Sequence, residues 1–372
     1  MARHARPAEP PASTAAVRRA SSVVEQLERA DVDAEIKVGR VTLKVTSLDK
    51  PLWPAARPAV TKRDFLRYLA TVSPVLLPHL ADRPVFATRA PDGADGKRFF
   101  QRKFPDAPDF VKSIPVWSTD NDSALDLLRV SDLATLLWLG QMAALELHAW
   151  FSRIARDADG RSLGTDYSSS GASVGASRLN YPDFLVVDLD AYRYSGKEAE
   201  GEEPRLHRAG FEMVRTVALE IREIVQSLGL VPFVKTSGKT GLHLYLPIRR
   251  RFTFDEVRRM ARAIGEHAER RLPKLVTLAW SVPDRRGKVF FDFNQNVRGK
   301  SLAVPYSPRL HPSATVSMPL TWDALAGIYP TDFTLHTVPA IVARDGDAWR
   351  DILDGKVDLG DALDVEELDE EP

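Results

Sequence analysis

The sequence predicts an α+β fold. Amphipathic helical segments alternate with short strand-like runs along the chain, which is the pattern of sheets that pack against helices. A hydrophobic content of 44% over 372 residues is enough for a proper core, in one large domain or two smaller ones. No internal repeat is apparent.

The N-terminal elements are expected in the following order. Residues 1–20 are rich in Ala, Pro and Arg, which predicts a disordered extension. A helix with Ser22 as a candidate cap follows, and residues 35–46 alternate as a strand or hairpin. Thr61 is the expected cap of an amphipathic helix that Pro74 interrupts.

The central part of the chain begins with its longest apolar stretch of helical character, residues 131–153. We expect a buried central helix there, with His148 near its end. Residues 156–182 are rich in Gly and Ser and predict a loop. Two further amphipathic helices are predicted over residues 210–229 and 253–273, each between strand-like runs.

Charge is balanced overall but unevenly placed. The chain has 51 basic and 51 acidic residues, yet residues 351–372 contain ten acids and one lysine. The rest of the chain carries an excess of nine positive charges, which suits a phosphate-binding groove. The acidic tail is either a solvated, disordered terminus or a segment that competes with nucleic acid for this groove.

Cysteines and membrane signals are absent from the sequence. The lack of cysteine excludes disulfides, zinc–cysteine sites and thiol nucleophiles, but it does not identify a compartment. No apolar run of about 18 residues occurs, and the first residues lack the apolar core of a signal peptide. We therefore expect a soluble, cytoplasmic protein with no membrane partner, associated with the nucleoid if it binds DNA.

Three aspartates lie in two strand-like runs. Asp188 and Asp190 are in FLVVDLDAY, where alternation puts both on one strand face and Leu189 on the other, and Asp292 is in KVFFDFNQN. Carboxylates that point the same way repel unless a cation lies between them, and hard oxygen ligands favour magnesium or manganese. The alternative is a pair of surface aspartates at a strand end.

A small-residue turn lies between these two runs, in VKTSGKTGLHLYLP. Backbone N–H groups around Ser237, Gly238 and Gly241 are candidates to cradle phosphate, with Lys239 as a positive charge and His243 on the next strand. The turn is not a Walker loop, because the GK[ST] ending and its helix are missing. The alternatives are an ordinary connecting turn and a satisfied core histidine.

The order of DLD, SGKTGLH and FFDFNQN, followed by PYSPR, resembles the polymerase domain of bacterial ATP-dependent DNA ligase D, in a stand-alone form. That family is a branch of the archaeo-eukaryotic primase superfamily. The resemblance is collinear from about Thr46 to Trp322. One departure is Thr240, because relatives often have a basic residue directly before the second glycine. In this chain Lys239 supplies the positive charge from one position earlier.

The resemblance implies a primase-polymerase fold, with central mixed or antiparallel sheets, an RRM-like catalytic core and flanking helices. It implies a single catalytic domain over residues 21–350. Within that domain we expect a DNA-binding part over about 40–155, the loop 156–182 and the catalytic core over 183–325, with the acidic tail over 351–372.

The resemblance also implies roles for individual residues. Asp188, Asp190 and Asp292 are implied to be catalytic and to hold two Mn²⁺ or Mg²⁺ ions, with NTPs or dNTPs as substrates. Such ions lower the pKa of a primer 3′-hydroxyl and neutralise charge on the triphosphate during in-line attack. The implied nucleotide-binding residues are His148, Ser237, Lys239, His243, Gln295 and Arg309; for Gln295 and Arg309 the alternative is an ordinary turn residue.

A separate surface is implied to bind DNA. Lys50 and Lys62 match lysines that grip a 5′-phosphate across a gap or break, and Phe99 and Phe100 match an aromatic pair that stacks on template bases. Lys103 belongs to the basic residues that flank this pair. The alternative for the two phenylalanines is a place in the core.

The expected function is that of a DNA repair polymerase. It would add ribo- or deoxynucleotides to a primer 3′-end at short gaps or double-strand breaks, in gap filling or non-homologous end joining, with Ku and a DNA ligase as candidate partners. No KxDG ligase motif follows, so we expect no ligase or nuclease module in this chain. The alternatives are a primase-type enzyme and a catalytically weak DNA-end-binding module that recruits Ku and ligase.

Overall fold

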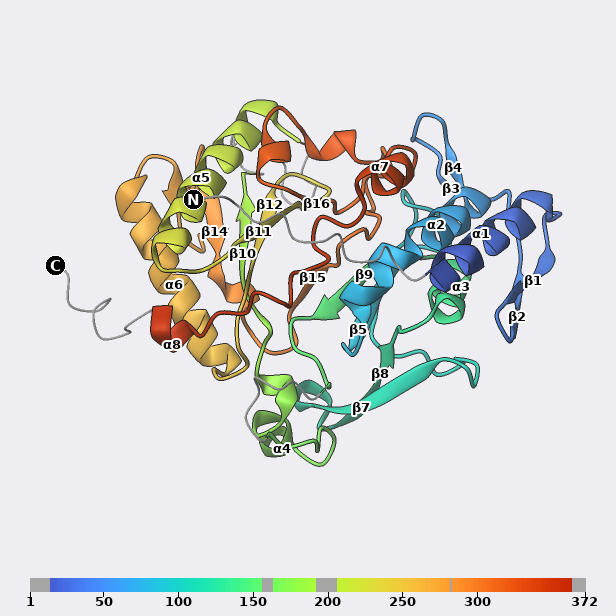
Figure 1. The fold of residues 1–372 in the computed structure, drawn as a ribbon, viewed down its shortest axis with the longest axis horizontal. Helices are drawn as coiled ribbons and strands as arrows, with labels where there is room; N and C mark the ends of the chain where they lie inside the picture. The colour runs from blue at the N-terminus through green and yellow to red at the C-terminus, as the bar shows by residue number, and fades with distance from the viewer. Residues whose placement is uncertain (1–13, 156–162, 192–205, 282, 363–372) are drawn as a thin grey trace.

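The computed structural model describes residues 14–155, 163–191, 206–281 and 283–362. Within this part of the chain, two six-stranded sheets and two two-stranded sheets combine with helices (Figure 1). Helices α5 (Arg208–Ser227) and α6 (Phe254–Arg271) lie along one large sheet, and α1 (Thr14–Arg29) and α2 (Lys62–Leu80) lie at the opposite end of the molecule (Figure 1). The predicted α+β class is confirmed.

The first large sheet, which we call sheet I, contains the strands with the three aspartates. Its order is β13 (Val276–Thr277), β14 (Val289–Asp292), β10 (Phe184–Asp190), β12 (Leu242–Pro247), β11 (Phe233–Thr236) and β16 (Pro319–Leu320). All neighbours are antiparallel except the parallel pair β13 and β14.

The two faces of sheet I have different partners. Leu185, Val187 and Leu189 of β10 are fully buried in the main core, which also contains the apolar residues of α5 and α6. The alternate residues Phe184 and Val186 belong to a separate apolar cluster on the other face. Asp188 and Asp190 continue this second face, as the alternation predicted, because two-residue periodicity fixes the side of the sheet.

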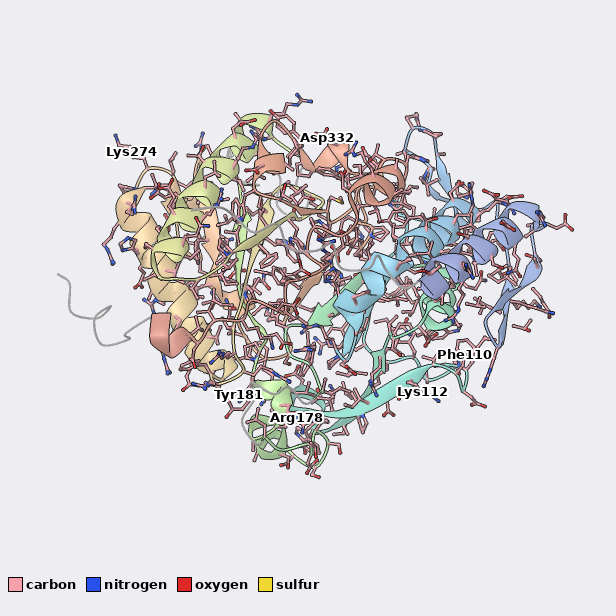
Figure 2. The ribbon with its side chains drawn as sticks, in the orientation of Figure 1. Phe110, Lys112, Arg178, Tyr181, Lys274 and Asp332 are labelled. Atoms are coloured by element: carbon pink, nitrogen blue, oxygen red, sulfur yellow. The ribbon has the colours of Figure 1, made fainter. Side chains whose placement is uncertain are left out.

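The second large sheet, sheet II, has the order β15 (Ser301–Ala303), β9 (Ala144–Trp150), β5 (Val85–Arg89), β8 (Ser123–Arg129) and β7 (Lys112–Ser118). Strand β6 (Phe99–Gln101) also pairs with β5. All of these pairs are antiparallel. In Figure 2 the labelled Phe110 and Lys112, near the start of β7, lie far from Lys274, which follows α6.

The prediction of one buried helix over residues 131–153 is wrong. Helix α3 (Leu133–Gln141) ends early, and Ala143 adopts a positive φ of 54° before β9 begins. In β9 the leucines and Ala149 enter the main core, while Glu146, His148 and Trp150 alternate on the other face. A two-residue period was hidden in a run whose residues are nearly all apolar, and His148 therefore lies on a strand.

The N-terminal helix starts before the predicted position. Helix α1 begins at Thr14, so Ser22 lies inside it and is not a cap, and the predicted extension is not disordered from residue 14 to residue 20. Buried Val23 and Leu27 join the main core, and α1 packs against α2. Residues 1–13 of the predicted extension lie outside the described residues.

Helix α2 is capped as predicted but is not interrupted. Thr61 accepts the Asp64 N–H, and the Asp64 carboxylate accepts the Thr61 N–H, which completes a capping box. Pro74 lies inside the continuous helix. Its missing N–H deprives the Ala70 carbonyl of a partner, but the Ser73 hydroxyl donates to that carbonyl at 2.8 Å. This substitute hydrogen bond explains why the predicted break does not occur.

Several other local predictions are confirmed. The predicted hairpin forms from β1 (Ala34–Val38) and β2 (Val41–Val45), and α5 and α6 cover the two predicted amphipathic segments. A short sheet of β3 (Pro51–Trp53) and β4 (Val60–Thr61) precedes α2. The remaining helices are α4 (Gly171–Gly175), α7 (Val338–Asp345) and α8 (Leu359–Ala362).

The predicted loop and tail are more ordered than expected. Helix α4 and a 3₁₀ turn at Arg178–Asn180 lie in the predicted loop, of which residues 156–162 are outside the described part. Ile352 and Leu359 are buried, and Val357 bridges to Ile248. Residues 351–359 of the predicted tail therefore pack on the fold and are not a disordered terminus. Residues 363–372 lie outside the described residues.

Across the described residues, no helix combines the length and the apolar character that crossing a bilayer requires.

Candidate active site

The three aspartates come together on one face of sheet I. Asp188 of β10 is directly opposite Asp292 of β14, and Asp190 follows two residues along β10. Cross-strand partners share a face, so the three carboxylates form one cluster. The antiparallel register of β10 and β14 creates this cluster, although the two strands are about a hundred residues apart in sequence.

Like charges make the cluster unfavourable without a cation. Burial and the neighbouring carboxylates of Asp190 and Asp292 raise the pKa of Asp188 to about 8. Burial also raises the pKa of Asp292, against the hydrogen bond from the Asn294 N–H. Oxygen ligands of this kind suit Mg²⁺ or Mn²⁺. Among the described residues, no three His, Asp or Glu side chains already converge on one metal position, so closing the site requires side-chain movement.

Two polar side chains orient these carboxylates. The Gln295 amide lies at the end of β14 and donates to Asp292 Oδ2 at 3.0 Å and to Asp188 Oδ2 at 3.4 Å. The Thr240 hydroxyl donates to Asp190 Oδ1 at 2.8 Å. Gln295 was a predicted nucleotide-binding residue, and the structure places it directly on the carboxylate cluster. Thr240 was noted only as a departure from the family.

His243 links the cluster to a buried lysine. It is opposite Asp188 in the β10–β12 register, and its Nε2 lies 3.4 Å from Asp188 Oδ1. Its Nδ1 lies 2.6 Å from Lys235 Nζ, which also donates to the Ser317 hydroxyl at 2.6 Å. Burial lowers the pKa of both Lys235 and His243. Lys235 was not among the predicted site residues, although a lysine inside the apolar run VPFVKT was a usable signal.

The Ser237 turn is a tight hairpin between β11 and β12. The Ser237 hydroxyl oxygen accepts the N–H groups of Lys239 at 3.1 Å and Gly241 at 3.0 Å. These two N–H groups are therefore engaged within the turn, and the phosphate cradle stays a prediction. Gly238 needs its glycine, because its φ is +75° and a Cβ would lie 2.6 Å from Arg309 Cγ.

Arg309 contacts this turn directly, and the buried Glu146 links Arg309 to His148. Arg309 Nε donates to Glu146 Oε1 at 2.9 Å, and its Nη1 donates to the Ser237 carbonyl. His148 Nε2 lies 3.5 Å from Glu146 Oε2. Burial opposes ionisation of Glu146, but Arg309 and His148 hold its pKa well below the ordinary value. Glu146 was not among the predicted site residues, although an acid inside the apolar run LELHAW was a usable signal.

The predicted aromatic pair is exposed and adjoins this network. Phe99 and Phe100 of β6 are 46% and 50% exposed, so they are not core residues. The Phe100 ring lies 5.7 Å from the His148 ring, and Arg102 lies 5.8 Å from the Phe100 centroid. Lys103 is also exposed, and its carbonyl accepts the Gln101 amide. The pair thus presents aromatic faces and cations beside the nucleotide-site candidates.

The predicted 5′-phosphate lysines form a second group. The Lys62 N–H donates to the Lys50 carbonyl at 2.9 Å, so the two residues are neighbours in space. Lys50 pairs with exposed Asp92 at 3.3 Å. Lys62 is 7% exposed, and its Nζ donates to the Thr46 carbonyl at 3.0 Å. Burial, and to a lesser degree the positive charge of Lys50, lowers the pKa of Lys62. None of their contacts within the described residues reaches the carboxylate cluster.

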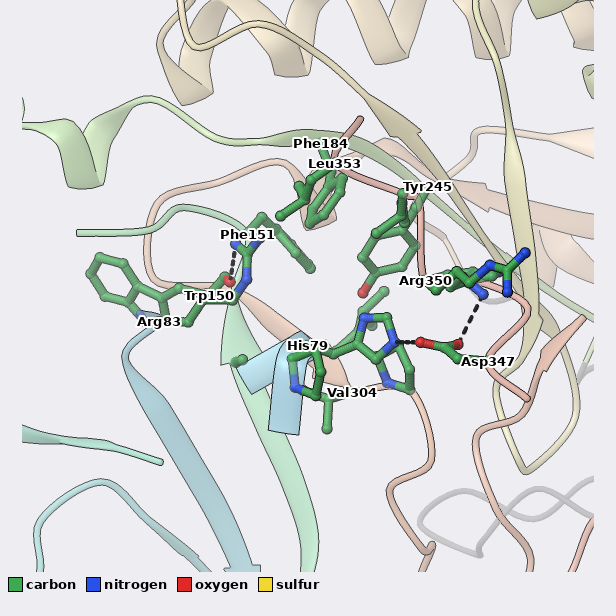
Figure 3. Close-up of a pocket in the computed structure, with 16 residues that line it drawn as sticks. His79, Arg83, Trp150, Phe151, Phe184, Tyr245, Val304, Asp347, Arg350 and Leu353 are labelled. Carbon is green, nitrogen blue, oxygen red and sulfur yellow. Dashed lines mark hydrogen bonds and ion pairs between the residues drawn. The ribbon is translucent and has the colours of Figure 1, made fainter. Parts of the chain in front are cut away.

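A cavity of about 100 Å³ lies elsewhere on the same face of sheet I (Figure 3). Phe184, Tyr245 and Trp349 line it, and Figure 3 shows His79 paired with Asp347, at 2.9 Å. Phe184 is at the opposite end of β10 from the aspartates. None of the predicted site residues lines this cavity, so it is separate from the candidate active site.

The family of the chain follows from comparison with known proteins. Residues 61–349 match the LigD primase-polymerase domain. The chain belongs to this family. The resemblance predicted from DLD, SGKTGLH and FFDFNQN is therefore confirmed.

Curated relatives of this LigD-family chain are longer proteins. The bifunctional non-homologous end joining protein LigD of Bacillus subtilis is 31% identical over 307 residues, which cover 82% of this chain and 43% of that protein. The multifunctional non-homologous end joining DNA repair protein LigD of Mycobacterium tuberculosis is 32% identical over 331 residues, which cover 87% of this chain and 38% of that protein. The chain thus spans less than half the length of these relatives.

A solved structure confirms the predicted primase-polymerase fold. The polymerase domain of Mycobacterium tuberculosis ligase D, in complex with DNA, superposes with a TM-score of 0.69 at 29% sequence identity. The match covers 85% of this chain and 99% of that domain. The individual roles assigned to the site residues stay predictions.

Proposed function

We propose that this protein is a DNA repair nucleotidyltransferase that adds ribo- or deoxynucleotides to a primer 3′-hydroxyl at short gaps or break ends. The observation that carries the proposal is the register of sheet I, which gathers Asp188, Asp190 and Asp292 on one face. Membership of the LigD primase-polymerase family supports it, as do the names of the relatives in non-homologous end joining.

The three carboxylates would hold two Mn²⁺ or Mg²⁺ ions. When bound, such ions activate the 3′-hydroxyl and neutralise charge on the triphosphate. Gln295 restrains the carboxylates of Asp188 and Asp292 by donating a hydrogen bond to each. Thr240 does the same for Asp190, and His243 for the other oxygen of Asp188. These contacts hold the carboxylates close to one another, so that a movement of side chains alone would bring their oxygens onto the ions.

The nucleotide would lie over the carboxylates and the adjoining Ser237 turn. Lys239 in this turn and Arg309 beneath it supply positive charge for the triphosphate. Glu146 fixes the Arg309 guanidinium through its Nε, so the arginine is held in one orientation. His148 completes this network and touches the Phe100 ring, which joins the nucleotide site to the aromatic pair.

The DNA would bind along the exposed aromatic pair and beside the Lys50 and Lys62 group. Phe99 and Phe100 offer stacking faces for template bases, with Lys103 nearby for phosphate. Lys50 and Lys62 would bind a 5′-phosphate, which offers negative charge to two adjacent cations. We place this activity in gap filling and end joining on nucleoid DNA in the cytoplasm, alongside Ku and a DNA ligase.

Primer extension on a 5′-phosphorylated gapped duplex tests the proposal. NTPs and dNTPs would be compared, each with Mn²⁺ or Mg²⁺, for the wild type, Asp188→Ala and Asp345→Ala. Asp345 is an exposed acid at the end of α7 and gives a matched loss of one charge. We expect extension by the wild type and Asp345→Ala, and a loss of at least about 100-fold for Asp188→Ala.

Direct metal binding gives a second readout. Mn²⁺ titration followed by electron paramagnetic resonance should show loss of bound ion in Asp188→Ala but not in Asp345→Ala. The absence of metal-dependent extension by the wild type under every condition would refute the proposed nucleotidyltransferase activity. If the wild type then still bound DNA ends, the end-binding alternative would replace it.

A further inference from the structure

Trp280 is the most exposed large hydrophobic side chain in the described part of the protein. It is 68% exposed, whereas Phe99 and Phe100 reach 46% and 50%. It lies just after β13, at the outer edge of sheet I. Tryptophan has a large apolar surface that is usually covered in a folded chain, so such exposure at the edge of an active-site sheet indicates a binding role.

The position of Trp280 is fixed from below. Its ring meets Phe290 edge-on, with centroids 6.2 Å apart and planes at 70°. Arg285 donates to the carbonyls of Ala279 at 3.0 Å and Trp280 at 2.7 Å, and its guanidinium lies 3.5 Å from the Phe290 centroid. The Arg285 guanidinium also lies over the Trp280 ring, 5.3 Å from its centroid, so the ring surface open to solvent is the part turned away from Arg285. A ring held in this way loses little conformational entropy when a ligand stacks on it.

Trp280 extends the row that contains the catalytic candidates. Phe290 is opposite Asp190 in the β10–β14 register, so its side chain shares the carboxylate face. One strand spacing of about 4.8 Å and one ring contact therefore separate Trp280 from Asp190. Stacked nucleotides rise by about 3.4 Å each. A strand that ends at the carboxylates thus brings one of its last few bases to Trp280.

We propose that Trp280 is the stacking platform for an unpaired base of the primer strand, a few nucleotides before its 3′-end, as in the single-stranded overhang of a break. Charge favours a nucleic-acid occupant, because Arg286 is exposed and Lys288 partly exposed against one exposed acid, Asp284, whereas Arg285 is buried on the Phe290 ring. Aromatic rings beside cations are the usual means of holding single nucleotides without sequence preference. The inference rests on the proposed polymerase function and adds a primer contact to it.

The first test measures DNA affinity without turnover. Fluorescence anisotropy with a duplex that carries a four-nucleotide single-stranded 3′ overhang on the primer strand, in the absence of nucleotides, would compare the wild type, Trp280→Ala, Trp280→Phe and Leu219→Ala. Leu219 is an exposed apolar residue on α5 and serves as the control. We expect Trp280→Ala to weaken binding roughly 5- to 100-fold. Trp280→Phe should retain most of the affinity, and Leu219→Ala all of it, with unchanged melting temperatures.

The second test locates the stacked base. Single abasic sites would be placed at each of the last four primer positions. At the stacked position, the abasic site should weaken binding to the wild type by the same factor as Trp280→Ala, and should have no further effect on that variant. This non-additivity is what a direct contact requires.

The outcomes separate this inference from the proposed function. If the wild type extends primers and Trp280→Ala binds primed DNA equally well, the stacking inference is overturned and the polymerase stands. The stacking inference would also be overturned if, at every position, the loss of affinity from the abasic site added to the loss from Trp280→Ala. A protein partner would then be left as the occupant of this surface. If the wild type neither binds nor extends primed DNA, the proposed function itself fails.

Discussion

Gly241 makes a close backbone contact beside the candidate metal ligands, and alanine at this position should disrupt both stability and activity. A Cβ at residue 241 would lie 2.0 Å from the Leu189 carbonyl oxygen and 3.3 Å from the Asp190 Cα. Gly241 precedes β12, whose register with β10 sets His243 opposite Asp188. Any displacement of β12 therefore reaches the carboxylate cluster.

The size of the effect follows from this distance. Non-bonded carbon atoms pack at about 3.5–4.0 Å, so the strand must shift by more than about 1 Å to admit the methyl group. Overpacking of this kind costs about 1–3 kcal/mol of stability. A misplacement of about 1 Å at a catalytic site costs about 100-fold in rate. We therefore expect Gly241→Ala to lose more activity than its modest loss of stability would suggest.

Urea denaturation and the kcat/KM of primer extension would measure the two effects. Gly355→Ala is the matched control, because a Cβ there meets no atom within 4 Å. Its stability should change by less than about 0.5 kcal/mol. Wild-type stability in Gly241→Ala would refute the close contact. Reduced stability with wild-type kcat/KM would refute the link between β12 and the carboxylates.

Three further predictions concern the tail, a buried charge and the second DNA contact. Removing residues 363–372 should leave the melting temperature unchanged, whereas removing 351–372 should lower it by several degrees; equal temperatures would contradict the packed tail. Burial opposes ionisation of Asp183, but Arg83 and Arg153 hold its pKa far below the ordinary range. Its contribution is therefore present above an unfolded pKa of about 3.9 and is lost as pH falls. Asp183→Asn should cost about 3–5 kcal/mol at pH 7, a difference from wild type that shrinks towards pH 3 in chemical denaturation. Replacing Lys50 and Lys62 with alanine should weaken binding to 5′-phosphorylated gaps more than to unphosphorylated ones; equal losses would count against the phosphate assignment.

Features that depend on neighbouring residues could be predicted from the sequence. The Thr61 cap, the hairpin over β1 and β2, and the common face of Asp188 and Asp190 each follow from a few consecutive side chains. Local rules suffice there, because the relevant hydrogen bonds and alternation lie within one element or one turn.

Predictions failed where a distant or unusual contact overrode the local pattern. Pro74 does not break α2, because Ser73 supplies the missing donor. His148 lies on β9 because pairing with β5 and β15 selects a strand in a run that also suits a helix. Such pairing energy is absent from the segment itself, so periodicity in an apolar run does not decide between the two.

The sequence by itself determined the inventory of chemistry: three strand aspartates, a glycine turn with Lys239 and His243, an aromatic pair among cations, and the family to which the chain belongs. Tertiary structure decided which of these groups are already engaged. Glu146 lies 163 residues from Arg309, yet it fixes the arginine at 2.9 Å. Lys235 supports His243 from another strand, and the Ser237 hydroxyl uses two N–H groups of its own turn. Packing brings Glu146 to Arg309 across 163 residues, whereas the Lys235 and Ser237 contacts depend on how the β11–β12 hairpin turns, which residue types alone do not fix.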